Sequence, residues 1–295
     1  MSGGRLSEAV FVRTASHIRE LVESWRLAHQ TVALVPTMGN LHRGHASLVE
    51  LAAGNADRVV MSIFVNPTQF GPGEDYAGYP RTLDEDRALV AETGLVDALL
   101  VPEVAEVYPF GVEAAVRFVM PELARELCGV KRPGHFDGVG SVVCRLLNIV
   151  GPDILVLGRK DYQQLVLLER MIADLRLPVQ VVSGETQRDD DGLAISSRNR
   201  YLTPAERRRA PALHTTLTRV RDALARGDRD FSALEAKAVN ALKEAGFKPD
   251  YVEVRNARDL SRPNGRSATT DLVVLAAAWL GKARLIDNVP VIPSR

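Results

Sequence analysis

Short apolar runs alternate with amphipathic stretches over the first two thirds of the chain. Runs rich in β-branched residues predict buried parallel strands at 31–35, 58–65, 98–101, 154–157 and 179–182. Apolar positions at helical spacing predict helices at 18–25, 45–53, 83–92, 139–150 and 162–175. Strands that alternate with helices are typical of an α/β fold, here a Rossmann-like, doubly wound parallel sheet. Such sheets bind ligands at the carboxyl ends of their strands.

The pattern changes after about residue 183. A polar stretch comes first, then amphipathic stretches that predict helices at 204–226 and 231–245, then short apolar runs that predict strands at 251–254, 272–278 and 283–286. We therefore expect a Rossmann-like nucleotide-binding domain over residues 1–184. A smaller α+β C-terminal domain, acting as a lid, is expected over residues 185–295.

Composition narrows the class of protein. The 295 residues are 46% apolar and 25% charged, and the formal net charge is zero. A neutral chain gives no bulk electrostatic reason to bind nucleic acid, and its apolar runs are too short to span a bilayer. Charged residues interrupt every apolar run before residue 31, so we expect no signal peptide. With only Cys128 and Cys144, we expect a cytoplasmic protein without structural disulfides.

The most informative segment is PTMGNLHRGH at residues 36–45. It follows an apolar strand and precedes an amphipathic helix, whose N–H groups and positive dipole end favour a phosphate bound at the turn. Imidazoles at this position, those of His42 and His45, donate hydrogen bonds to charge that builds up during phosphoryl or nucleotidyl transfer. Gly44 leaves room for a ligand close to the backbone. Zinc is an alternative, but no Cys or acidic residue stands nearby at metal-site spacing.

A second polar segment is GLAISSRNR at residues 192–200. A loop between domains would also be rich in Ser and Asn. It would not specially require two hydroxyls and a guanidinium in succession, as Ser196, Ser197 and Arg198 provide. Together these groups make a clamp for a polyphosphate, and on a mobile loop they would close over a bound nucleotide and exclude water.

A third segment, GRKDYQQ at residues 158–164, begins where a predicted strand ends. Lys160 supplies a point charge at the rim of the sheet, and Gln164 is placed to hydrogen-bond a polar substrate. Asp161 has two open interpretations, a cap for the following helix or a ligand contact.

The loop after residue 63 combines the amides of Asn66 and Gln69 with flanking Phe residues, a mix that suits a small ligand bearing hydroxyl and methyl groups. Core packing explains the Phe residues equally well. In RPGHFDGV, which begins at residue 132, His135 is either structural or a ligand contact. The acids at residues 84–86 suit a helix start, and a magnesium role is an alternative for them.

These five segments and YPRT at residues 79–82, taken in their order along the chain, resemble the pantoate–β-alanine ligase family of the H-x-G-H nucleotidyltransferase superfamily. The family pattern reads PTMG-x-LHxGH, SIFVNPxQF, YPRT, RPxHFxGV, GxKDYQQ and DGLAMSSRN, and the resemblance runs from about residue 32 to residue 201. Two positions depart from it, because Ile195 replaces the usual Met and Arg159 replaces the usual Glu. Neither change removes a group that the chemistry requires.

The resemblance implies a two-step reaction in the synthesis of pantothenate, a coenzyme A precursor. The pantoate carboxylate attacks the α-phosphate of ATP and gives pantoyl adenylate and pyrophosphate. The amine of β-alanine then attacks the adenylate and gives pantothenate and AMP. The resemblance also implies Mg²⁺ with the ATP and a homodimer, with no nucleic-acid or membrane partner.

The resemblance further implies roles for individual residues. Catalytic roles fall on His42, His45, Lys160, Ser196, Ser197 and Arg198. The ATP-binding residues are Met38, Gly39, Asn40, Leu41, His42, Arg43, Gly44, His45, Gly158, Arg159, Lys160, Asp161, Gln187, Ile195, Ser196, Ser197 and Arg198. The substrate-binding residues are Pro36, Thr37, Met38, Asn66, Gln69 and Gln164. Glu85 and Asp86 are candidates for Mg²⁺.

Three other interpretations share part of this pattern. An adenylyltransferase has the H-x-G-H turn but does not predict the NPTQF and KDYQQ segments together. A fragment of a tRNA synthetase is disfavoured by the zero net charge. A nucleotide-binding regulatory module without catalysis would not need both histidines, Lys160 and the SSRN loop.

Overall fold

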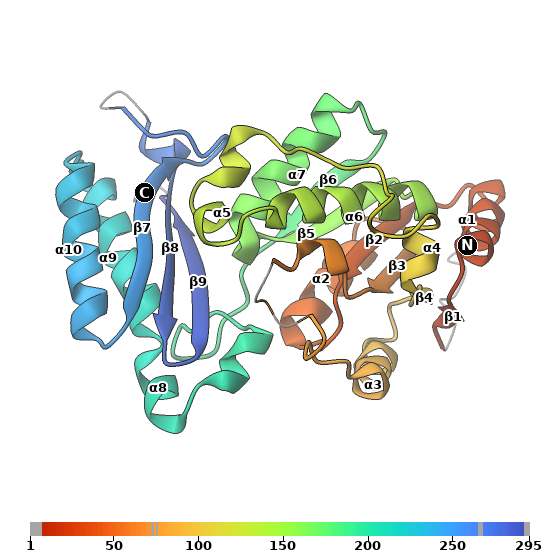
Figure 1. Cartoon of the computed structure of the whole chain (residues 1–295), viewed down its shortest axis with the longest axis horizontal. Coiled ribbons are helices and arrows are strands. Elements are labelled where there is room, and N and C mark those ends of the chain that lie inside the picture. The colour runs from red at the N-terminus through yellow and green to blue at the C-terminus, as the bar shows by residue number, and fades with distance from the viewer. Residues whose placement is uncertain (1–7, 72–73, 75, 265–267, 292–295) are drawn as a thin grey trace. The chain divides into compact units, whose positions relative to one another are not determined.

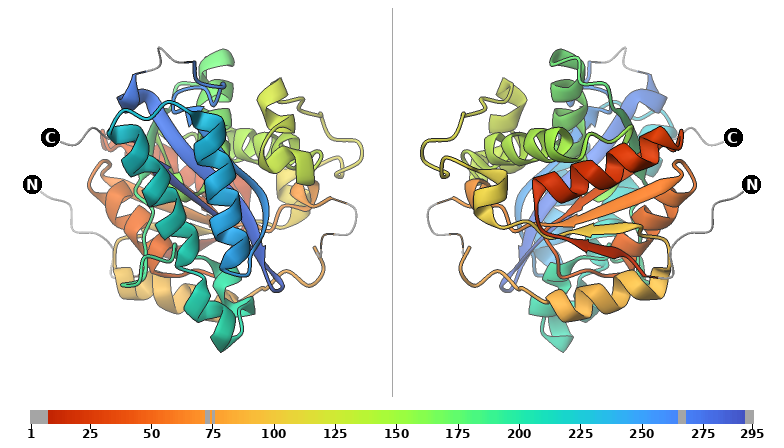
Figure 2. Two further views of the ribbon diagram at one scale, coloured as in Figure 1. Left: turned by 90° about the vertical axis from the view of Figure 1, so that its left-hand side faces the viewer. Right: turned by 90° about the vertical axis from the view of Figure 1, so that its right-hand side faces the viewer.

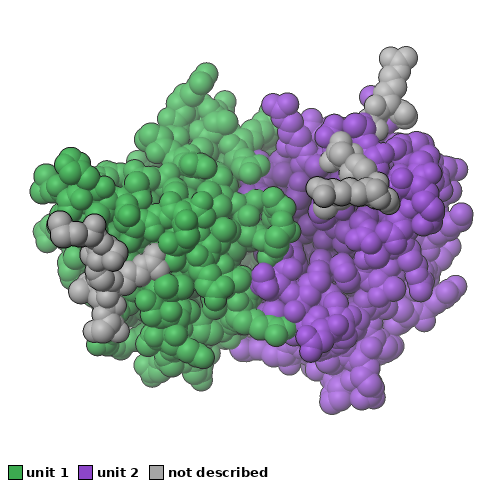
Figure 3. All heavy atoms as spheres, turned by 180° about the vertical axis from the view of Figure 1, so that it is seen from behind, with its two compact units in different colours: residues 1–159, 167–185 green, residues 160–166, 186–295 purple. Residues whose placement is uncertain are grey.

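The computed structural model describes residues 8–71, 74, 76–264 and 268–291. These residues form two compact units (Figure 3). The first unit comprises residues 1–159 and 167–185, and the second comprises residues 160–166 and 186–295. The expected boundary after residue 184 lies one residue from this division, but residues 160–166 group with the second unit. No helix in the described part of the chain is both long and apolar enough to cross a membrane.

The first unit is built on a six-stranded sheet (Figure 1). Its strands are β1 Val10–Val12, β2 Val32–Thr37, β3 Arg58–Ile63, β4 Ala98–Leu100, β5 Ile154–Gly158 and β6 Gln180–Gly184. They lie in the order β1-β4-β3-β2-β5-β6, and every neighbouring pair is parallel. The expected doubly wound parallel sheet is therefore confirmed. The chain leaves β2 toward β3 and leaves β5 toward β6, so the topological switch point lies between β2 and β5.

Helices cover both faces of this sheet (Figure 2). The helical segments along this part of the chain are α1 Ala15–Leu27, α2 Arg43–Ala53, η1 Pro67–Gln69, α3 Leu83–Thr93, α4 Val104–Val107, η2 Glu122–Arg125, α5 Cys128–Lys131, α6 His135–Val150, η3 Arg159–Asp161 and α7 Tyr162–Asp174. On one face, α2 and α3 bury a cluster that includes Val35, Val49 and Met61. On the other face, α1 packs against α6.

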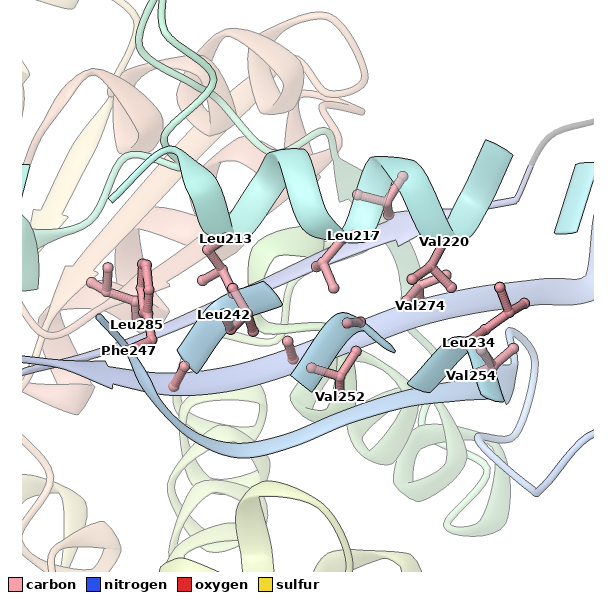
Figure 4. Close-up of a cluster of buried hydrophobic side chains, with 14 of the residues drawn as sticks. Leu213, Leu217, Val220, Leu234, Leu242, Phe247, Val252, Val254, Val274 and Leu285 are labelled. Atoms are coloured by element: carbon pink, nitrogen blue, oxygen red, sulfur yellow. The ribbon is translucent and has the colours of Figure 1, made fainter. Parts of the chain in front are cut away.

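The second unit is a three-stranded antiparallel sheet with helices (Figure 1). Its elements are η4 Ser197–Tyr201, α8 Pro204–Arg209, α9 Ala212–Ala225, α10 Phe231–Glu244, β7 Lys248–Asn256, η5 Thr269–Asp271, β8 Leu272–Leu280 and β9 Ala283–Pro290. Figure 4 shows side chains of α9 and α10, such as Leu217 and Leu234, pointing toward strand residues such as Val274. One apolar layer between helices and sheet therefore forms the core of this unit, which has the expected α+β character.

The sequence interpretation of the elements differs from the structure at several places, and two of them have a plain physical reason. A single helix was expected at 204–226, but it is divided into α8 and α9 at Ala210 and Pro211. Pro211 has no N–H to continue the helical ladder, and its ring clashes with the preceding turn. The edge strand β1 was missed because three residues carry too little pattern, and its partner β4 is distant in the sequence.

We expect truncation of Leu34, which is completely buried in β2, to lower the free energy of unfolding of the first unit by about 2–5 kcal/mol. The lost methyl groups leave a cavity between sheet and helices. Urea unfolding followed by Trp25 fluorescence in a Trp279→Phe background measures the effect of Leu34→Ala. Leu27→Ala is the control, because Leu27 is 79% exposed and its loss should change stability by about 0.5 kcal/mol or less. Equal effects of the two truncations would contradict this picture of the core.

Candidate active site

The turn between β2 and α2 has an unusual backbone. Gly39 and Asn40 have successive positive φ angles of 79° and 54°. A Cβ on Gly39 would lie 2.8 Å from Asp86 Oδ2, so glycine is required both for the backbone angle and for the space. Thr37 Oγ1 donates to Ser62 O at 2.7 Å and accepts from Gly39 N at 3.2 Å. These contacts fix the end of β2 against β3.

Asp86 holds this turn from α3. Its carboxylate is 2% exposed and accepts hydrogen bonds from Asn40 N at 3.0 Å, Leu41 N at 2.7 Å and Thr82 Oγ1 at 3.3 Å. Both oxygens are therefore engaged with the protein. The neighbouring Glu85 is exposed. Within the described residues, no group of three or more His, Cys, Asp or Glu side chains is placed to hold a metal.

The two histidines of the turn stand at the start of α2. His42 is the N-cap residue, and the two rings lie 4.1 Å apart between centroids. His45 Nδ1 accepts a hydrogen bond from His42 N at 3.3 Å. A ring that accepts at Nδ1 carries its neutral-state proton on Nε2. The first turn of α2 itself contains no acidic residue.

Asn66 organises the loop after β3. It is 1% exposed, and its Oδ1 accepts from Thr68 N at 3.3 Å and from Tyr108 OH at 2.8 Å. Its Nδ2 donates to Gln69 Oε1 and to Gly138 O, both at 3.1 Å. Asn66 therefore orients the side chain of Gln69, whose Nε2 lies 3.1 Å from Met38 Sδ.

The RPGHFDGV segment contacts the backbone of the same loop, at Thr68 and Gln69. Arg132 donates to His135 Nε2 at 2.8 Å, which leaves the proton on Nδ1 to bond Gln69 O at 2.9 Å. A Cβ on Gly138 would lie 2.3 Å from Thr68 O, so α6 contacts the loop backbone directly. Of the two interpretations of His135, these contacts favour the structural one. Tyr108 had no sequence signal, because only the fold brings it to Asn66.

Gly158 is the last residue of β5, the other strand at the switch point, and Arg159 follows it. Arg159 forms an ion pair with Glu185, and its Nε donates to Ser183 Oγ at 3.0 Å. Arg159 therefore pairs with the acidic residue that directly follows β6, and this acid offsets the positive charge that Arg159 adds.

Three of the expected catalytic residues meet in the second unit. A pocket there is lined by Lys160, Leu193, Ala194, Ser196, Arg198, Asn199, Leu213, His214, Arg284, Leu285, Ile286 and Asp287. Lys160 Nζ lies 3.1 Å from Asp161 Oδ2. Ser196 caps η4 by accepting from Arg198 N at 3.3 Å. The lining of this pocket thus brings cationic and hydroxyl groups close to one another.

The expected residues around this pocket have different environments. Gln187 O accepts from Ile195 N at 2.9 Å, so residue 195 is held through its backbone and the change from Met to Ile leaves that contact intact. Ser197 is the first residue of η4, and Gln164 is half-buried in the first turn of α7.

Asp287 is the buried charge of this pocket. It accepts from Arg188 NH1 at 2.7 Å and NH2 at 2.9 Å, and His214 Nδ1 lies 3.5 Å away. Burial by itself raises the pKa of Asp287, but hydrogen bonds from His214 and Arg188 outweigh it, and the net pKa is lowered. The carboxylate therefore stays ionised inside the unit.

The H-x-G-H turn lies at the switch point of a doubly wound parallel sheet, which is where α/β proteins of this class bind their ligands. A family model described as Pantoate-beta-alanine ligase matches residues 10–290. The pantothenate synthetase of Nitrosococcus oceani is 51% identical over 280 residues, 95% of this chain and 97% of that protein. That of Halorhodospira halophila is 54% identical over 274 residues, 92% and 95% of the two chains. The chain belongs to the pantoate–β-alanine ligase family.

Solved structures agree with this assignment. The pantothenate synthetase of Thermus thermophilus superimposes with a TM-score of 0.85 at 43% identity, over 96% of this chain and 100% of that one. The pantoate–β-alanine ligase of Francisella tularensis, solved in complex with "Beta-gamma ATP and Beta-alanine", has a TM-score of 0.78 at 34% identity. It is covered over 97% of its length, and 96% of this chain is covered.

We expect Asp86→Asn to lower the free energy of unfolding by about 1.5–3 kcal/mol, because an amide cannot accept at both positions where the carboxylate holds Asn40 N and Leu41 N. Glu85→Gln is the matched control, since Glu85 lies exposed on the same helix. Thermal unfolding with and without Mg²⁺ checks both variants. A loss in Asp86→Asn that appears only with Mg²⁺ would contradict the turn-holding role.

The lowered pKa of Asp287 predicts a specific acid sensitivity. Its ion pair stabilises the fold fully above the ordinary carboxyl pKa of 3.8, and that stabilisation is lost as the pH falls through the lower folded-state pKa. The free energy of unfolding of the wild type should therefore fall more steeply below pH 3.8 than that of Asp287→Asn. Urea unfolding at a series of pH values measures both slopes. Parallel curves would contradict the prediction.

Proposed function

We propose that this protein condenses pantoate with β-alanine at the expense of ATP, and that it releases pantothenate, AMP and pyrophosphate. The observation that carries the proposal is the His42–His45 turn at the switch point of the sheet. Beside it, Gln69 lies next to Met38 in a loop with polar and apolar character. Family membership supports the same reaction, and the Francisella relative was solved in complex with "Beta-gamma ATP and Beta-alanine".

The first step forms a P–O bond and breaks one. A pantoate carboxylate oxygen attacks the α-phosphorus, and the bond to the bridging oxygen breaks, so pyrophosphate leaves with that electron pair. We propose that the Nε2–H of His45 and the ring of His42 donate to the developing charge at the start of α2. Lys160 and Arg198 offset charge on the remaining phosphates, and the hydroxyls of Ser196 and Ser197 donate hydrogen bonds to them.

The second step exchanges the acyl group. The neutral amine of β-alanine attacks the acyl carbon of pantoyl adenylate, AMP leaves with the C–O electron pair, and the amine loses a proton to solvent. No covalent enzyme intermediate is needed, because adenylation has already provided a good leaving group. Catalysis then rests on positioning and on charge stabilisation.

The roles proposed for substrate contact follow the family resemblance. We propose that Gln69 and Gln164 hold pantoate, and that Pro36, Thr37 and Met38 separate it from the nucleotide. Asn66 acts through Gln69, because its own polar atoms are occupied. The backbone from Gly39 to Gly44, together with Gly158, Asp161, Gln187 and Ile195, is proposed to contact ATP.

The residues at the start of α3 do not suit a resident magnesium ion, because both oxygens of Asp86 already accept hydrogen bonds from the protein. Mg²⁺ is therefore proposed to arrive with the ATP phosphates, and no step is assigned to a protein-bound ion. A homodimer and a cytoplasmic location stay predictions from the family resemblance.

Pantoate-dependent exchange of labelled pyrophosphate into ATP, without β-alanine, tests the first step. We expect His45→Ala to lower this exchange about 100- to 1,000-fold, the usual cost of losing one donor to transition-state charge. His17→Ala is the control, because His17 is exposed on α1. Folding of both variants is checked by circular dichroism.

Exchange that does not depend on pantoate would overturn the proposed substrate. Addition of β-alanine should then release free AMP, whereas a stable adenylylated product would indicate an adenylyltransferase. Near-normal exchange by a folded His45→Ala variant would remove His45 from the catalytic residues.

A further inference from the structure

Two adjacent residues of β9, Asp287 and Asn288, point to opposite faces of the small sheet, as neighbours on a strand do. Asp287 lies on the same face of β9 as Leu285 and Val289, which belong to the apolar cluster between this sheet and the helices. A buried carboxylate therefore occupies a position where its neighbours contribute apolar core. Both Asp287 and Asn288 are 4% exposed. Burial of a polar or charged side chain lowers the stability of the fold unless its polar atoms form hydrogen bonds or ion pairs.

Asp287 is connected to the SSRN loop through Arg188. The guanidinium makes two hydrogen bonds to the carboxylate and a third to Gly192 O at 3.1 Å. Arg188 forms an antiparallel bridge with Ala194, and Ile195 N donates to Gln187 O. These contacts close a hairpin over residues 187–195. Its second arm runs directly into Ser196, so the direction of the loop is fixed at the end nearest its hydroxyls.

Asn288 is connected to the other cationic segment. Its Nδ2 donates to Lys160 O at 3.0 Å, and its own backbone N donates to Asp287 Oδ1 at 2.8 Å. Asn288 therefore holds the main chain of Lys160, and the adjacent residue Asp287 holds Arg188. The pocket lined by Lys160, Ser196 and Arg198 lies against this same part of β9.

We propose that Asp287 and Asn288 are positioning residues that set the spacing between Lys160 and the Ser196–Arg198 loop for the adenylation step. Neither reacts, and each acts through a neighbour: Asp287 through Arg188, and Asn288 through the carbonyl of Lys160. Their loss lowers the rate at which ATP is attacked and leaves pantoate binding unchanged, because the contacts described above run from Asp287 to Arg188 and from Asn288 to Lys160, and none of them involves the proposed pantoate residues Gln69 and Gln164. This inference rests on the proposed function.

The test is pantoate-dependent pyrophosphate exchange by Asn288→Asp and Asp287→Asn. Asn288→Asp keeps the shape but turns the donor that faces Lys160 O into an acceptor. Asp287→Asn keeps the shape but removes the charge between Arg188 and His214. Each variant should lower kcat at least tenfold and raise the KM for ATP, with the KM for pantoate within twofold of the wild type. Arg188→Lys is a third variant, used if either of these fails to fold, because lysine keeps the charge but not the paired hydrogen bonds.

Leu224→Ala is the matched control for stability, because Leu224 is fully buried in the same core near the far end of α9 from His214. Rates are compared per folded molecule at a temperature below every unfolding midpoint. Exchange within twofold of the wild type in folded variants, or a loss no larger than that of Leu224→Ala, would overturn the positioning role. Absence of exchange in the wild type would instead overturn the proposed function, so the two failures are distinguishable.

Discussion

The buried carboxylate of Asp86 is the constraint on which the first unit depends. The chain must change direction within a few residues between β2 and α2. Gly39 and Asn40 make this possible with two successive positive φ angles. Such a backbone leaves N–H groups that a strand or helix would have paired. Asp86 accepts two of them from a helix more than forty residues later in the chain. The start of α2, and with it the placement of His42 and His45, follows from that contact.

The same arrangement recurs at each candidate segment. A group proposed to contact a ligand, or the backbone beside it, is held by a polar residue that is almost completely buried. Asn66 holds Gln69, Asp287 holds the hairpin before Ser196, and Asn288 holds the backbone of Lys160. Reactions that rely on positioning rather than on a covalent nucleophile need this rigidity, because small displacements of a donor remove much of its effect. The buried polar groups therefore matter to the chemistry through the residues that they orient.

Much of the fold could be predicted from the sequence, because parallel strands that are buried on both faces have continuous apolar sequences. The run at 58–65 became β3, and the amphipathic stretch at 162–175 became α7. The prediction was less accurate where a helix-breaking residue interrupts a helical pattern and where an element is very short. The helix expected at 204–226 ignored Pro211, and β1 was too short to carry a period. The additional turn of α6 before Val139 was also missed, since a Gly134 cap in the left-handed region permits the helix to begin at His135.

The sequence by itself determined the motifs, their order and hence the family, because H-x-G-H, NPTQF and SSRN are local patterns with their own physical meaning. Only the tertiary structure decided which polar residues have their hydrogen-bonding atoms occupied by other parts of the protein. Asn66 was expected to contact substrate and Asp86 was a candidate for magnesium, yet both have their polar atoms committed to distant backbone and side-chain groups. Tyr108, Asp287 and Asn288 had no signal at all. Burial and hydrogen-bond partners depend on residues far apart in the chain, and no local pattern of residue types encodes them.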